Sequence, residues 1–88
     1  MRIGIKKVEG GKLVKVKILE EEGIIKEIRI AGDFFVHPEE AIEELEEFLK
    51  GIPLNKVRDR IREFMNEKKI RLVGLKIDDL VEVIEGSK

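Results

Sequence analysis

Few side chains in this 88-residue sequence are of a type that carries out catalysis. His37 is the single histidine, Ser87 is the single hydroxyl side chain, and there are no cysteines. A histidine that acts as a general base needs a nucleophile and an orienting group beside it. The sequence supplies neither near His37, so we predict no catalytic residue and place His37 at the N-cap of a helix. The lack of cysteine excludes disulfides, zinc–thiolate sites and iron–sulfur ligation by this chain's thiolates.

Two charged stretches could each be mistaken for a binding site. Residues 39–47 hold six glutamates, but calcium loops gather oxygen ligands around a turn containing glycine, and this stretch has a helical pattern. We predict a solvated helix face and no metal site. Residues 56–71 are rich in Lys and Arg, yet Asp59, Glu63 and Glu67 are interspersed and no aromatic ring is exposed for stacking on bases. We favour an ion-paired helix surface, and a small RNA-binding α+β module using this basic helix remains the alternative.

Two glycine-containing segments have a defined local chemistry. Gly10 and Gly11 precede a strand and no Ser or Thr follows them, so we predict a hairpin turn with Glu9 rather than a phosphate-binding loop. In Gly32–Phe35, the aspartate can accept hydrogen bonds from nearby backbone N–H groups and fix a turn. Adjacent residues of an extended segment point to opposite faces, so a one-sided sheet cannot easily bury both phenylalanines. Either both rings enter the core, or one stays outside as an anchor for a partner.

Composition and length indicate one small domain. The chain carries 18 basic and 19 acidic residues, so its net charge of -1 gives no reason to expect nucleic acid or an anionic membrane as a partner. No apolar run approaches the roughly 20 residues that span a bilayer, and the N-terminus lacks a signal-peptide pattern. We expect a single domain over residues 1–88 in the cytoplasm, with one modest core and no deep cleft.

Hydrophobic periodicity predicts the elements that position these segments. Alternating apolar and polar residues predict strands over Met1–Val8, Lys12–Leu19 and Ile24–Ile30. The turns between them, at residues 9–11 and 20–23, are short, so the three strands should pair antiparallel as a meander. Apolar residues at helical spacing predict three helices, and an apolar link that could be extended joins the last two. In order, these segments are Pro38–Lys50, Leu54–Asn66, the link Ile70–Val73, and Ile77–Ile84, followed by a frayed tail at Gly86–Lys88.

The resulting fold class is α+β: a three-stranded antiparallel sheet with helices packed on one face. In the third strand Ile28 and Ile30 should point to the core, with Glu27 and Arg29 pointing outward. The outer face of the sheet, which also carries Lys15 and Lys17, should be solvated or meet a polar partner.

Taken in order, four segments resemble the C-terminal accessory domain of lipoate–protein ligases. These are GGKLVKVKI, an acidic turn with Gly23, IIKEIRIAGDFF and PEEAIEELEEFLKG. The resemblance covers Gly10–Gly51 well. Its most specific part is the strand that runs into Gly32–Phe35, followed after two residues by PEE and a helix that closes on glycine. Residues 52–88 agree in element order but carry little motif signal.

The resemblance implies a non-catalytic small subunit of a two-component lipoate–protein ligase, because some prokaryotes encode this domain apart from the catalytic one. In the family, lipoate is activated with ATP and Mg²⁺ to lipoyl-AMP and then transferred to a lysine of an acceptor protein. The large domain holds lipoate and ATP, so this chain is expected to bind no cofactor alone. The fold known for the family is SufE/IscU-like. The absence of cysteine argues against its iron–sulfur branch, which leaves a cysteine-free sulfur-trafficking scaffold as a further alternative.

The family motif also implies which residues meet the catalytic subunit. Carried over position by position, the matching residues are Gly11, Lys12, Gly32, Asp33, Phe34 and Phe35. We expect these six residues to order the edge of the domain that faces the partner.

Overall fold

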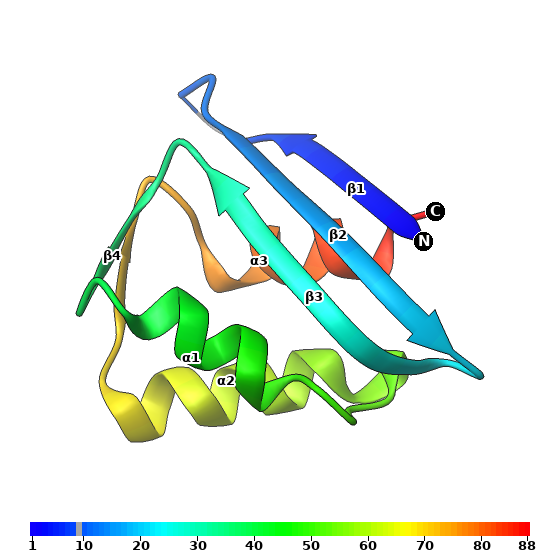
Figure 1. Cartoon of the computed structure of the whole chain (residues 1–88). Coiled ribbons are helices and arrows are strands. Elements are labelled where there is room, and N and C mark those ends of the chain that lie inside the picture. The colour runs from blue at the N-terminus through cyan, green and yellow to red at the C-terminus, as the bar shows by residue number, and fades with distance from the viewer. Residues whose placement is uncertain (9) are drawn as a thin grey trace.

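The structure is a computed structural model that describes residues 1–8 and 10–88. Strands β1 (Arg2–Lys7), β2 (Leu13–Glu21) and β3 (Ile24–Gly32) form an antiparallel sheet in the order β1-β2-β3 (Figure 1). This confirms the predicted meander. Gly10 and Gly11 have positive φ angles of 88° and 78°, as a glycine turn requires. Glu9, which we also assigned to this turn, lies outside the described residues.

The hairpin between β2 and β3 is tighter than predicted. Glu20 and Glu21, expected in a turn, instead pair with Ile25 and Ile24 across the sheet. Only Glu22 and Gly23 form the turn, with φ angles of 52° and 81°. Two central residues with positive φ are typical of a type I′ turn, whose twist matches that of the flanking strands.

One face of the sheet forms the core. Val14, Val16 and Ile18 are fully buried, and Ile28 and Ile30 point inward as predicted. Helix α3 (Ile77–Glu85) packs on β1 and β2, α1 (Ala41–Phe48) packs on β3, and α2 (Val57–Lys68) packs on α3. A short 3₁₀ turn, η1 (Leu54–Lys56), precedes α2, so the second helix begins and ends slightly later than predicted. The predicted sheet with helices on one face is confirmed.

Gly4 allows α3 to approach the sheet closely. A Cβ atom at this position would lie 2.3 Å from the carbonyl oxygen of Val83 in α3. No other residue type fits such an approach without moving the helix.

The segment before α1 differs from the prediction. Residues Phe35–His37 form a short strand, β4, which pairs with β5 (Arg71–Val73) in a separate two-stranded ribbon. His37 therefore ends a strand and is not a helix N-cap, and α1 begins after Glu40 rather than at Pro38. A residue before proline disfavours the helical conformation, and here its backbone belongs to the ribbon. The link at Ile70–Val73 is extended, but the sequence did not predict its partner.

The predicted frayed tail is wrong. The Ile3 N–H donates to the Lys88 carbonyl at 2.8 Å, and the Lys88 N–H donates back to the Ile3 carbonyl at 3.1 Å. Ser87 is buried and its hydroxyl donates to the Ile84 carbonyl at 2.7 Å. The last residues therefore pair with the outer edge of β1, and the two termini lie side by side (Figure 1).

At the opposite edge of the sheet, formed by β3, a glutamate side chain from α1 binds the backbone. Glu46 of α1 is only 8% exposed and accepts a hydrogen bond from the Ile30 N–H at 2.7 Å. It is the exception to the solvated glutamate face that we predicted for residues 39–47, because it satisfies a backbone donor that has no neighbouring strand. Farther along β3, the Gly51 N–H donates to the Ile25 carbonyl at 2.7 Å.

Candidate functional site

The six residues predicted from the family motif lie at one end of the sheet. The Asp33 N–H donates to the Leu13 carbonyl at 2.9 Å, and Gly32 is paired with Val14. This pairing holds the start of β2, with Gly11 and Lys12 before it, beside the end of β3. A Cβ atom on Gly32 would lie 2.3 Å from the Leu13 carbonyl oxygen, so only glycine allows this contact.

The loop after β5 joins this group, which the sequence reasoning missed. Gly74 has a φ angle of 88°. A Cβ atom added to it would lie 3.0 Å from the Lys12 Cδ and 3.8 Å from the Asp33 carbonyl oxygen. The aliphatic stem of Lys12 therefore lies over Gly74. A single glycine at the end of a short apolar segment indicates a turn, but not which side chain covers it.

The two phenylalanines have different surroundings. Phe34 is half-buried against the core, and its ring lies close to Gly32. Phe35 is 72% exposed, and its partner across the ribbon, Val73, is 54% exposed. The alternative in which both rings enter the core is therefore excluded. We call the following eight residues the docking edge, after the role expected from the family motif: Gly11, Lys12, Gly32, Asp33, Phe34, Phe35, Val73 and Gly74.

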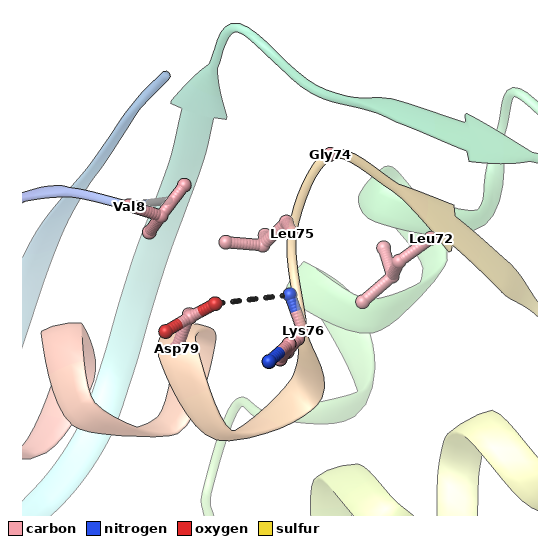
Figure 2. A pocket seen from close by; sticks show the side chains of 6 residues that line it. All are labelled: Val8, Leu72, Gly74, Leu75, Lys76 and Asp79. Carbon is pink, nitrogen blue, oxygen red and sulfur yellow. Dashed lines mark hydrogen bonds between the residues drawn. The ribbon is translucent and has the colours of Figure 1, made fainter. Parts of the chain in front are cut away.

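A hollow of about 350 Å³ opens beside the docking edge, and the two share Gly74 (Figure 2). Its other lining residues are Val8, Leu72, Leu75, Lys76 and Asp79. In Figure 2 the Leu75 side chain extends toward Val8, and the Asp79 carboxylate accepts a hydrogen bond from the Lys76 backbone N–H, at 3.2 Å. The hollow is largely apolar, so it suits an apolar side chain of a partner better than a reacting group.

The carboxylate of Asp79, which lines this hollow, is paired with Lys6. The Lys6 ammonium donates to Asp79 at 3.0 Å and also to Glu82. The hydrogen bonds to Glu82 and Asp79 raise the pKa of Lys6, and the hydrogen bond from Lys6 lowers the pKa of Asp79. Among residues 1–8 and 10–88, no group of three or more His, Asp or Glu side chains is arranged to hold a metal ion.

The sequence singled out two further candidates, His37 and the basic segment at residues 56–71. His37 is exposed and faces Arg71 across the ribbon. The arginines of α2 are ion-paired, as predicted. Arg60 binds Glu63 of the same helix at 3.2 Å, but Arg58 and Arg62 both reach Asp78 of α3, at 2.9 and 3.2 Å. No helix in the described part of the chain is both long and apolar enough to cross a membrane.

Comparison with known proteins identifies the family. The family described as "Bacterial lipoate protein ligase C-terminus" matches residues 5–84. The chain belongs to this family. The chain is 36% identical over 72 residues to "Lipoate-protein ligase A subunit 2" of Thermoplasma acidophilum, covering 82% of this chain and 76% of that protein. The family resemblance seen in the sequence motif is thereby confirmed.

A solved structure agrees with the fold of this chain. It is described as a bi-partite lipoate protein ligase and its E2 lipoyl domain from Thermoplasma acidophilum. One chain in it superposes with a TM-score of 0.87 at 32% identity, covering 96% of this chain and 94% of that one. The homologues are thus the small part of a two-part ligase.

Proposed function

We propose that this chain is the non-catalytic small subunit of a two-component lipoate–protein ligase in the cytoplasm. It binds a catalytic subunit through the docking edge and enables ATP-dependent adenylation of lipoate. The relatives described as a ligase subunit 2 and as part of a bi-partite ligase support this proposal. The observation that carries it is the exposure of Phe35 beside Val73 on a short ribbon at the site of the family motif.

The docking edge has the composition of an interface anchor. A fully buried Phe or Val side chain contributes about 1.5–3 kcal/mol relative to an exposed one. Aromatic anchors of this kind usually lie at the centre of an interface, with polar residues around them. Here Lys12 and Asp33 are the polar residues.

The reaction divides between the two subunits. A lipoate carboxylate oxygen attacks the α-phosphorus of ATP, giving lipoyl-AMP and pyrophosphate; a lysine amine of the acceptor then attacks the acyl carbon and AMP leaves. The catalytic subunit would hold ATP, Mg²⁺ and lipoate. In this chain the neighbouring carboxylates of Asp79 and Glu82 already bind the Lys6 ammonium, so they do not offer the open set of oxygen ligands that Mg²⁺ needs.

The contribution of this chain is to cover the site. Lipoyl-AMP is a mixed anhydride that water hydrolyses readily, and a subunit that closes over it excludes water and orders the surrounding groups. An anchor such as Phe35 would hold the cover in place during adenylation and release it for transfer.

The proposal is tested by mixing the purified subunits with lipoate and ATP–Mg²⁺ and measuring pyrophosphate release. Release should be much faster with this chain than without it, and a mixture lacking lipoate gives the background rate. Equal release with and without the chain would reject the proposed function.

A further inference from the structure

The outer face of the sheet gathers three cations, Lys15, Lys17 and Arg29. Lys15 and Lys17 project from β2, and Lys17 is directly paired with Arg29 of β3. Like charges opposite each other across a sheet are destabilising. Arg29 lies 3.7 Å from Glu46, but its side chain is 78% exposed. Within the described residues, neither lysine takes part in an ion pair.

This arrangement contrasts with the helical side of the molecule. There, Lys6 binds two carboxylates, and Arg58 and Arg62 share Asp78. Although the net charge of the whole chain is -1, the outer face of the sheet has a local excess of positive charge from Lys15, Lys17 and Arg29. Such a local excess is a reason to expect an anionic partner at this face.

The same face is hollowed and flanked by apolar side chains. A hollow of about 340 Å³ is lined by Lys15, Lys17, Arg29 and Ala31. Ile3 and Ile5 of β1 lie directly across from Lys17 and Lys15, and they are 44% and 62% exposed. A free phosphate would need only the cations, whereas a protein surface would cover both the cations and these apolar side chains.

We propose that this cationic sheet face binds an acidic surface of the protein that accepts the acyl group. The inference rests on the proposed function. The docking edge has the exposed Phe35 and Val73 side chains at its centre, which suits contact with the catalytic subunit. The cationic sheet face combines its charges with the exposed side chains of Ile3 and Ile5. Its charge suits a partner that must arrive and leave in each catalytic cycle, because charge mainly raises association rates.

The test uses the reconstituted two-subunit complex with an apo-lipoyl domain of E2 as the acceptor. In the variant Lys15→Gln/Lys17→Gln, the KM for the acceptor should rise roughly threefold to tenfold, as expected for the loss of two exposed charges. Its dependence on salt concentration should also weaken. The matched control Lys56→Gln/Lys68→Gln removes two exposed lysines from the helical side and should leave the KM for the acceptor unchanged.

A direct binding measurement locates the contact. In ¹⁵N spectra of the full chain titrated with the apo-lipoyl domain, amide shifts should centre on Lys15, Lys17 and Ala31. Shifts confined to the β4–β5 ribbon, or an unchanged KM in the Lys15→Gln/Lys17→Gln variant, would overturn the inference. The inference would also be overturned if Lys15→Gln/Lys17→Gln lost pyrophosphate release measured without the acceptor, because the catalytic subunit would then cover this face. The proposed function would still stand in that case. If release never depends on the chain, the proposed function itself fails.

Discussion

Phe34 and Phe35 are adjacent in the chain but contribute to different properties of the molecule. The ring of Phe34 packs against the core beside Gly32, whereas Phe35 is 72% exposed opposite Val73. Alternation along an extended backbone explains this difference, because successive side chains point to opposite faces. Phe34 should therefore govern stability, and Phe35 should govern binding.

Replacing Phe35 with alanine should weaken binding of the catalytic subunit by about tenfold to one hundredfold, as for an aromatic anchor. The free energy of unfolding should change by no more than about 0.5 kcal/mol, because the ring is already exposed. Calorimetric titration with the catalytic subunit and denaturant unfolding measure the two quantities. The control Phe34→Ala should lower the free energy of unfolding by about 1–3 kcal/mol. Unchanged affinity in Phe35→Ala would contradict the assignment.

The contact between Lys6 and Asp79 should make stability depend on pH. Because the hydrogen bond from Lys6 lowers the pKa of Asp79 below its usual 3.8, the contact stabilises the fold above that value and is lost as the pH falls through the folded-state pKa. The pKa of Lys6 is raised, so its contribution is fully present below 10.5 and is lost only at higher pH.

Unfolding temperatures from pH 7 to pH 2 test this dependence. The variant Asp79→Asn should be less stable than the parent at pH 7, and the difference should shrink as the pH falls below 3.8. Asp59→Asn, on the exposed face of α2, serves as the control and should show no such change. A difference of the same size at pH 7 and pH 2 would show that the contact contributes nothing through its charge.

At the scale of elements, Glu46 links α1 to the edge of the sheet. Its buried carboxylate accepts the Ile30 N–H at 2.7 Å, in the place where a further strand would otherwise pair. Glu46→Leu should lower the free energy of unfolding by about 1–3 kcal/mol, the cost of leaving a buried donor without a partner.

Glu46→Gln keeps an acceptor oxygen and should recover much of this stability. Glu43→Leu on the exposed face of the same helix should have little effect. Hydrogen exchange of the Ile30 amide provides a local measurement and should speed up in Glu46→Leu relative to the parent. Unchanged exchange would mean that this hydrogen bond does not protect the edge.

Local patterns predicted the elements well where neighbouring residues decide the structure. The alternation in Val14, Val16 and Ile18 gave β2, and the spacing of Leu80, Val81 and Ile84 gave α3. The errors lie where distant segments pair. His37 joins a ribbon with Arg71, and the last residue pairs with Ile3. Neither contact leaves a periodic signal in the sequence.

In the candidate site, too, the residues close together in the sequence were predicted and those contributed by a distant segment were not. The family motif identified the six residues from Gly11 to Phe35, and the structure brings them to one end of the sheet. Gly74 and Val73 complete the docking edge from a segment about forty residues farther along, and only the fold reveals their position. The role of all these residues in binding a partner remains a proposal.

For the whole molecule, the one-sided sheet leaves two surfaces of different character. The docking edge offers exposed apolar side chains, with Phe35 and Val73 at its centre. The cationic sheet face offers Lys15, Lys17 and Arg29 around a hollow. This division of surfaces matches our proposals that the chain holds one protein at the docking edge and receives another at the sheet face.

The most direct test of the central claim is a titration of the catalytic subunit with this chain while pyrophosphate release is measured. Release should rise with the concentration of the chain and then saturate. Phe35→Asp should require a much higher concentration for half-maximal release, while Phe34→Leu should stay close to the parent. Identical curves for the parent chain and Phe35→Asp would contradict the claim that this edge joins the two subunits.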